Sequence, residues 1–331
     1  MNVRERFQRV MNFKPVDTLP AMEWICWWDK TLARWHDEGL PKDLSREDVL
    51  RHFSMDVHEW IWLSPRGNIT RPDGKTRSEG VIDTEADYDN LVAPVLARGP
   101  VIDRDRLKRI ADMHAKGDVV VWLQLDGFFW YPREIFGVER HLYAFFDQPV
   151  LMKRMNDDLC RYNAACLNIV LEYLTPDVMT FAEDLSYNSG PMLSREQFDE
   201  FIAPCYHRII PLAKTRGIIP MVDTDGDVTS VVPWFIDAGI EGCLPLERMA
   251  GVDVAKLRHD HPSWRMIGGF DKTVMHRGED AIRTEFERLL PVMRSGGYIP
   301  TTDHQTPPDV SVEMFRCYTR LLREYCAKAA I

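Results

Sequence analysis

Several features that define common classes of protein are missing from this sequence of 331 residues. No apolar run is long enough to span a bilayer, and the start, Met1 to Phe7, lacks the apolar core of a signal peptide. The basic residues form no block, and a net charge of -10 opposes binding to a polyanion such as nucleic acid. The sequence therefore predicts a soluble, cytoplasmic protein that binds neither nucleic acid nor a membrane.

Cysteine pairs and nucleotide-binding motifs are also absent. The seven cysteines are odd in number and form no C-x-x-C pair, which is typical of reduced thiols in a reducing compartment. No phosphate loop, H-E-x-x-H or G-x-S-x-G sequence occurs, and no G-x-G-x-x-G turn follows a predicted strand. The acidic run 223–227 resembles a calcium loop, but its glycine is in the fourth position and Trp234 stands in the twelfth. These absences exclude an EF-hand. They also disfavour a dinucleotide-binding open sheet, because the glycine-rich motif of that fold is missing.

What the sequence does contain is a regular alternation of short apolar runs and helical patterns. An amphipathic helix over 2–12 opens the chain, and a helical pattern over 30–53 has Ser45 as an N-cap. A D-G turn at Arg71–Lys75 indicates a hairpin, and Pro204 and Pro211 are expected to kink a helix over 195–216. Strands are predicted at residues 19–24, 57–63, 119–125, 178–182, 218–223, 241–246, 265–269 and 298–302, with helices at 150–174, 228–238, 252–259, 279–294 and 311–329. About eight strands alternating with helices predict a single (β/α)8 TIM barrel over 1–331 with an N-terminal helical extension.

Most of the later predicted strands end in an acidic residue. Asp223 and Asp225 follow one strand and should share a face, because side chains at i and i+2 point the same way in an extended chain. Glu183-Asp184, Glu247, Asp271-Lys272 and Asp303-His304 follow four others. Helix capping would explain any single acid. Two adjacent carboxylates repel each other, and a metal, a substrate cation or a shared proton would each relieve that repulsion.

Two candidate sites follow from this arrangement. Asp223, Asp225 and His304 would ligate zinc or another divalent cation, with Glu247 as a fourth ligand or a base, and Asp225, Glu247 and His304 as catalytic residues. Lys272 is the alternative neutralising group, because it could pair with these acids without a metal. The aromatic residues at the exits of the first and third strands should line one side of a substrate pocket: Trp24, Trp27, Trp28, Phe129, Trp130 and Tyr131.

The chain resembles the uroporphyrinogen decarboxylase superfamily, which includes methyltransferases that serve corrinoid proteins. The resemblance covers nearly the whole chain, from Arg4-Glu-Arg-Phe and Phe13–Asp17 to Glu183-Asp184-Leu, Leu193–Phe198, Gly268–Lys272 and Asp303-His304. It implies a single α/β barrel and substrate-binding roles for Asp56, Glu183, Asp184 and Lys272. His304 matches the histidine of the family's C-terminal active-site loop.

The sequence departs from both branches of that superfamily. True uroporphyrinogen decarboxylases have P-V-W-x-M-R-Q-A-G-R after the first strand, whereas this chain has no arginine there before Arg34. Their F-S-D-I is altered to Phe53-Ser-Met-Asp56. The coenzyme M methyltransferases have H-x-C-G at the fifth strand end, where this chain has Asp223-x-Asp225-Gly226. The ligand spacing is kept, but its chemistry becomes oxygen-rich.

The resemblance therefore predicts a metal-assisted methyltransferase that moves a one-carbon group, such as a corrinoid-linked demethylase. A corrinoid would be the methyl acceptor or donor, and the expected partners are a small-molecule substrate and a corrinoid protein. The alternative is a decarboxylase acting on uroporphyrinogen or another cyclic or aromatic acid. A non-catalytic barrel that binds a small molecule is the third hypothesis, and a homodimer is an expected assembly.

Overall fold

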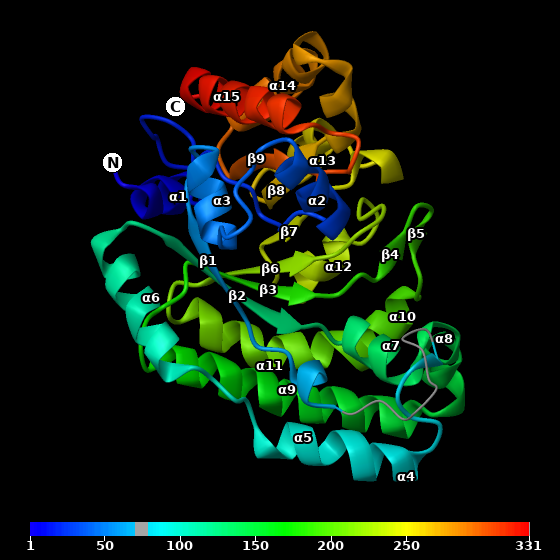
Figure 1. Ribbon diagram of the computed structural model, residues 1–331. Coiled ribbons are helices and arrows are strands. Elements are labelled where there is room, and N and C mark those ends of the chain that lie inside the picture. The colour runs from blue at the N-terminus through cyan, green and yellow to red at the C-terminus, as the bar shows by residue number, and fades with distance from the viewer. Residues whose placement is uncertain (70–78, 331) are drawn as a thin grey trace.

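A curved sheet of seven parallel strands is the centre of the fold (Figure 1). This computed structural model describes residues 1–69 and 79–330, and the hairpin predicted at Arg71–Lys75 lies outside them. In spatial order the strands are β1 (His58–Trp62), β2 (Val120–Asp126), β3 (Val178–Ala182), β6 (Ile219–Asp223), β7 (Gly242–Leu244), β8 (Arg265–Phe270) and β9 (Tyr298–Thr302). A separate antiparallel ribbon consists of β4 (Ser186–Tyr187) and β5 (Gly190–Pro191).

The central strands form because their residues can be buried on both faces of the sheet. Every residue of β2 and β3 is buried, as is typical of parallel strands covered by helices. Neighbouring strands pair in parallel register, for example Ala182 of β3 opposite Asp223 of β6. All seven carboxyl ends therefore lie at one edge of the sheet, which is the edge where barrels of this type place ligands.

Helices cover the outside of the sheet, as Figure 1 shows for α9 and α11 on one side and α14 and α15 on another. The N-terminal half contributes α1 (Val3–Met11), α2 (Asp29–Asp37), α3 (Arg46–His52), α4 (Glu85–Asp87), α5 (Ala93–Arg98), α6 (Arg104–Lys116), α7 (Trp130–Phe136) and α8 (Val138–Asp147). The remainder contributes α9 (Pro149–Leu171), α10 (Arg195–Gln197), α11 (Ala203–Lys214), α12 (Val232–Asp237), α13 (Val254–Asp260), α14 (Glu279–Met293) and α15 (Val312–Lys328).

The strand predicted at residues 19–24 does not form, and this part of the prediction was wrong. Pro20 has no N–H, and the N–H of Ala21 donates to the Asp56 carboxylate at 2.9 Å instead of to a neighbouring strand. The segment still lies between β9 and β1, because Trp24 Nε1 donates to the Thr302 carbonyl and Asp56 N donates to the Ala21 carbonyl. The fold is thus α/β and TIM-barrel-like, with a seven-stranded curved sheet among the described residues.

The other helix and strand predictions agree with the structure apart from their ends. The pattern at 30–53 is divided into α2 and α3, and the Ser45 side chain caps α3 by accepting from Asp48 N, as predicted. The helix with two prolines is interrupted by a π-helical turn at Phe198–Ile202, before α11. The predicted N-terminal helix is α1, and it buries Phe7, Val10 and Met11 against the barrel.

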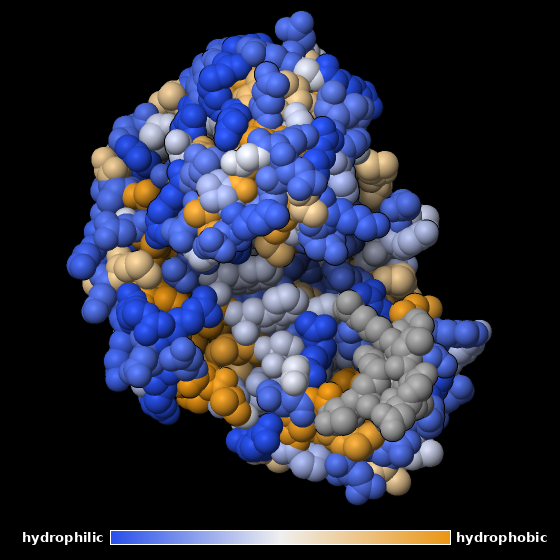
Figure 2. All heavy atoms as spheres, viewed as in Figure 1, coloured by the Kyte–Doolittle hydropathy of each residue, from blue (hydrophilic) through white to orange (hydrophobic). Residues whose placement is uncertain are grey.

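The molecular surface is hydrophilic over most of the face drawn in Figure 2, and this face is hollowed near its middle. None of the helices in ranges 1–69 and 79–330 combines the length and apolarity needed to cross a membrane.

Candidate active site

The loop after β6 is held tightly against its neighbours. Thr224 N donates to the Leu244 carbonyl at the end of β7, and Thr224 Oγ1 accepts from Leu185 N at 3.1 Å. Gly226 has a φ of +82°, and a Cβ there would approach the Ser186 carbonyl carbon to 2.7 Å. A residue without a side chain is therefore required at this turn. Gly226 N donates to Glu247 Oε2 at 3.0 Å, which fixes the carboxylate of the next strand end beside this loop.

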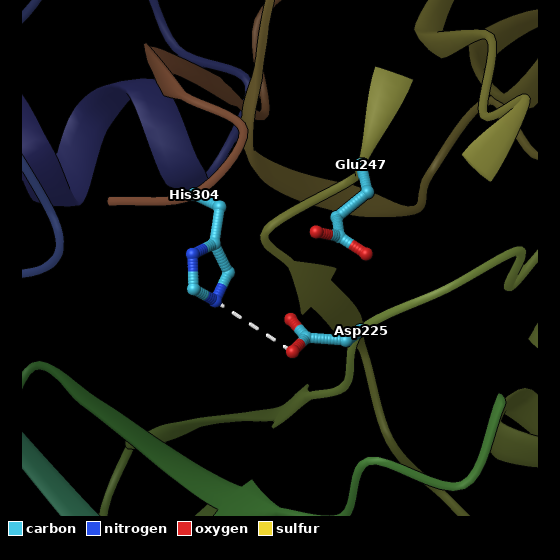
Figure 3. Close-up of side chains that lie close together, drawn as sticks. All are labelled: Asp225, Glu247 and His304. Carbon is cyan, nitrogen blue, oxygen red and sulfur yellow. Dashed lines mark ion pairs between the residues drawn. The ribbon is translucent and has the colours of Figure 1, made fainter. Parts of the chain in front are cut away.

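Asp225, Glu247 and His304 come together at the carboxyl ends of β6, β7 and β9 (Figure 3). One ligand atom from each side chain lies within 4.8 Å of the other two, and His304 Nε2 is 3.6 Å from Asp225 Oδ2. Burial disfavours the charged imidazole, but the hydrogen bond and charge of Asp225 outweigh it and raise the pKa of His304. Burial and the nearby Asp225 carboxylate raise the pKa of Glu247. Two oxygens and one nitrogen of this kind fit a zinc or similar divalent site.

Asp223 and Asp184 lie next to this cluster but outside it. Gln124 Nε2 donates to Asp223 Oδ2 at 3.2 Å, and burial together with Asp184 and Asp225 raises the pKa of Asp223 well above its ordinary value. Burial and Asp225 raise the pKa of Asp184 to about 6, although Arg133 lies 3.3 Å from its Oδ2. Asp184 also has a left-handed φ of +39°, an uncommon conformation that often occurs at functional sites. The sequence predicted Asp223, Asp225 and His304 as ligands with Glu247 as a possible fourth, and the structure groups Glu247 with Asp225 and His304 and leaves Asp223 beside them.

A small pocket of about 130 Å³ opens beside these acids. It is lined by aromatic and acidic side chains from several strand ends: Trp24, Ile25, Trp60, Trp62, Gln124, Trp130, Ala182, Asp184, Asp223, Asp225 and His304. A larger cavity of about 570 Å³ adjoins it across Trp62 and includes Arg66 and Glu134.

The aromatic wall differs from the one that the sequence predicted. Trp24 and Trp130 do line the pocket. Trp27 packs instead against Trp35 and Phe315, and Trp28 is 44% exposed at the start of α2. Phe129 packs against His141 and Phe145, and Tyr131 is fully buried. The six residues therefore do not form one converging wall, because Trp27, Phe129 and Tyr131 are packed into the hydrophobic core and Trp28 is exposed.

Sequence reasoning missed Trp60 and Trp62, which complete the wall. Both belong to β1, and their i, i+2 spacing places them on one face of the strand, where their rings stack with centroids 5.4 Å apart. That spacing was visible in the sequence and could have identified them.

Three predicted substrate-binding residues are engaged with protein groups. Glu183 is fully buried and accepts from Phe128 N, Phe129 N and Tyr206 Oη. Asp56 accepts from Ala21 N. Lys272 Nζ lies 3.2 Å from Asp303 Oδ1, so it pairs with this acid and not with Asp223 or Asp225. Asp303, which the sequence did not single out as a site residue, is buried and also accepts from Arg248 N.

Gly268 and Gly269 lie in β8, where missing side chains permit a close approach by another group. The backbone is the partner, because a Cβ at Gly268 would lie 1.9 Å from the Pro245 carbonyl oxygen. Those glycines therefore bring β8 against the segment that leads to Glu247.

Fold and site together define an α/β protein of the TIM-barrel type with an acidic pocket at the strand ends. The chain belongs to the uroporphyrinogen decarboxylase (URO-D) family, whose sequence profile matches residues 135–325, more than half of its length. No curated protein sequence matches it.

Two solved structures illustrate the fold-level similarity. A methyltransferase from Methanosarcina mazei is 14% identical, with a TM-score of 0.63 over 98% of this chain and 99% of that one. A B12-independent methionine synthase from Shewanella sp. W3-18-1 is 10% identical, with a TM-score of 0.48 over 94% and 92% of the two chains. At 14% identity, the similarity to the Methanosarcina methyltransferase shows a shared fold.

Proposed function

We propose that this protein is an enzyme that transfers a one-carbon or small alkyl group between a small-molecule substrate and a corrinoid carried by a partner protein. The observation that carries the proposal is the Asp225–Glu247–His304 cluster at the edge of the pocket. Its position at the carboxyl ends of parallel strands is the position of active sites in barrels of this type.

The donor set of the cluster fits a divalent cation such as zinc. Asp225, Glu247 and His304 would be its ligands, and the ion would supply Lewis acidity to an atom of the bound substrate. Asp225 is already oriented by His304, and Glu247 by the Gly226 N–H, so two of the three ligands are held before any ion binds. Lys272 forms its ion pair with Asp303, and its charge also acts on Glu247 and His304, so it offsets part of the negative charge of the cluster without being one of its ligands.

The size of the pocket indicates how the substrate and the corrinoid would be placed. A space of about 130 Å³ beside the cluster accommodates a small molecule, and the larger cavity of about 570 Å³ lies across Trp62. We therefore expect the substrate to enter the pocket while a corrinoid approaches from the mouth, delivered by its own protein.

The acidity of the pocket disfavours the decarboxylase alternative. Asp184, Asp223 and Asp225 line it, and neither lysine nor arginine occurs among its described lining residues. A substrate carboxylate placed there would be repelled, because close like charges raise the free energy of the ionised state.

Turnover assays test the proposal. Purified protein is incubated with reduced cobalamin and a panel of small methyl donors, and methylcobalamin is followed by its absorption. We expect methylation with at least one donor and its loss in Asp225→Ala. Carbon dioxide released from uroporphyrinogen would contradict the proposal, and so would the absence of any turnover with demonstrated ligand binding, which would favour a binding protein.

A further inference from the structure

The aromatic part of the pocket wall offers a ligand mainly apolar surface. Three of its tryptophans have their indole N–H groups engaged by protein acceptors: Trp24 donates to Thr302 O at 2.9 Å, Trp60 to Gln124 Oε1 at 3.0 Å and Trp62 to Asp126 Oδ1 at 3.0 Å. Since these polar edges are satisfied within the protein, what the three rings offer to a ligand is apolar surface. The amide of Gln124 is used as well, because its nitrogen donates to Asp223.

The polar groups that remain in the pocket are mainly acids. Asp184 and Asp223 lie outside the three-residue cluster, and each feels the charge of the other carboxylates. Arg133 lies 3.3 Å from Asp184 Oδ2, but no lysine or arginine occurs among the described residues that line the pocket beside Asp223. A ligand that matches these surroundings carries a positive charge, few hydrogen-bond donors and an apolar exterior.

We infer that this pocket binds the methylated ammonium head group of a small molecule, with Asp184 and Asp223 facing its charge and Trp60 and Trp62 facing its methyl groups. A primary ammonium group could also pair with these acids, but it would leave the apolar faces of Trp60 and Trp62 without methyl groups to contact. The volume of about 130 Å³ is of the right order for such a head group.

The tryptophans act here mainly through apolar contact. Trp60, Trp62 and Trp130 stack in a row, and the guanidinium of Arg66 lies 3.8 Å from the centre of the Trp130 ring while that of Arg46 lies 5.9 Å from Trp60. Because arginines already lie over both ends of the row, we expect Asp184 and Asp223 to provide the selectivity for a positive charge. The rings of Trp60 and Trp62 would provide the selectivity for methyl groups.

The inference rests on the proposed function only in taking the bound molecule to be the alkyl donor. The head group would then anchor the donor, while Asp225, Glu247 and His304 lie beside it on the side of the reacting atom.

Calorimetric titration with three matched probes tests the inference at constant ionic strength. Choline carries a trimethylammonium group, ethanolamine has the charge without the methyl groups, and 3,3-dimethylbutan-1-ol has the same shape without the charge. We expect choline to bind at least about tenfold more tightly than either relative. Asp223→Asn should weaken choline binding about tenfold and Trp62→Leu by about three- to tenfold, whereas Trp28→Leu, outside the pocket, should bind like the parent chain.

Circular dichroism of each variant establishes that it is folded before it is titrated. Equal binding of choline and its neutral isostere, unchanged binding by Asp223→Asn and Trp62→Leu, or no choline binding at millimolar concentrations would each overturn the inference. The two proposals fail separately. Methyl transfer from a neutral ether without choline binding would end this one, and choline binding without any transfer would end the proposed function.

Discussion

The two ends of strand β3 hold buried acids in opposite situations. Asp177 precedes the strand, and Asp184 follows it by two residues. Asp177 accepts from Arg4, Gln8, His114 and the Val121 N–H. Asp184 lies beside Asp225 and has Arg133 as its cationic neighbour, at 3.3 Å. At the amino end of β3, the Asp177 carboxylate is surrounded by hydrogen-bond donors. At the carboxyl end, the Asp184 carboxylate lies close to another carboxylate.

The pKa values express this difference. Burial alone would raise the pKa of Asp177, but the hydrogen bond and charge of His114 and the hydrogen bonds from the Val121 N–H and Arg4 prevail and lower it. At the other end, burial and Asp225 raise the pKa of Asp184 to about 6. A carboxylate whose charge is stabilised contributes to folding, while one that is destabilised stores free energy that a bound cation can release. The comparison therefore assigns stability to the amino end of β3 and ligand binding to its carboxyl end.

The largest effect on stability is expected at the satisfied end. Asp177→Ala removes the acceptor of several buried donors and should lower the free energy of unfolding by about 3–5 kcal/mol, as for a buried pair that loses one partner. Urea denaturation gives this value, and turnover per folded molecule should stay unchanged. A loss below about 1 kcal/mol would contradict the role assigned to Asp177.

The next effect is expected at the crowded end, and on activity. Asp225→Ala should lower turnover by about 100-fold or more, because a ligand of the proposed metal is lost, while stability changes by less than about 1 kcal/mol. The matched control is Asp227→Asn, two residues away, where the carboxylate accepts from Thr229 N and is not part of the cluster. Equal losses in both variants would remove the distinction between the two acids.

The dependence of stability on pH sharpens the comparison further. The folded pKa of Asp177 is below the ordinary value of 3.8, so its contribution is complete above about pH 4 and disappears as the pH falls through the folded pKa. The difference in unfolding free energy between the parent chain and Asp177→Asn should therefore be greatest near neutral pH and shrink in acid. Denaturation midpoints from pH 7 to pH 2.5 measure it. A difference that stays constant would show that Asp177 acts through packing and not through its charge.

The smallest effect is expected at Trp28, which was predicted to line the pocket and is instead 44% exposed. Trp28→Ala should change the unfolding free energy by less than about 0.5 kcal/mol and leave turnover unchanged. Trp24→Ala should impair turnover, because Trp24 lines the pocket and lies edge-on to His304 with ring centroids 6.3 Å apart. Similar kinetics of the two variants would mean that the pocket described here is not the substrate site.

The parts of the structure that the sequence predicted are those set by local pattern. From β2 to α15 the alternation of apolar runs and amphipathic segments identifies the strands of the main sheet and most of the helices that follow them, because period-2 and period-3.6 patterns are visible in a single sequence. Helices α7 and α8 and the β4–β5 ribbon were not predicted. Acids that follow successive strands were expected at one edge, since parallel strands end together, and Asp225, Glu247 and His304 do meet there.

The parts that the sequence did not predict depend on long-range partners. Residues 19–24 have a strand-like pattern, yet the Asp56 carboxylate takes the N–H of Ala21. From the sequence, Lys272 could pair either with Asp223 and Asp225 or with Asp303. It pairs with Asp303 because of the relative positions of β8 and β9, which the sequence does not reveal. Aromatic residues bury large areas wherever they lie, so their number in the loop 126–132 could not distinguish a pocket wall from the core.

Metal binding by the cluster is the most direct test of the account. Protein purified without chelator is analysed for bound metal and then titrated with Zn²⁺, in parallel with Asp225→Ala and Asp227→Asn. We expect close to one equivalent of Zn²⁺ in the parent chain and in Asp227→Asn, and little or none in Asp225→Ala. Substoichiometric metal in all three proteins, or equal binding by Asp225→Ala, would contradict it.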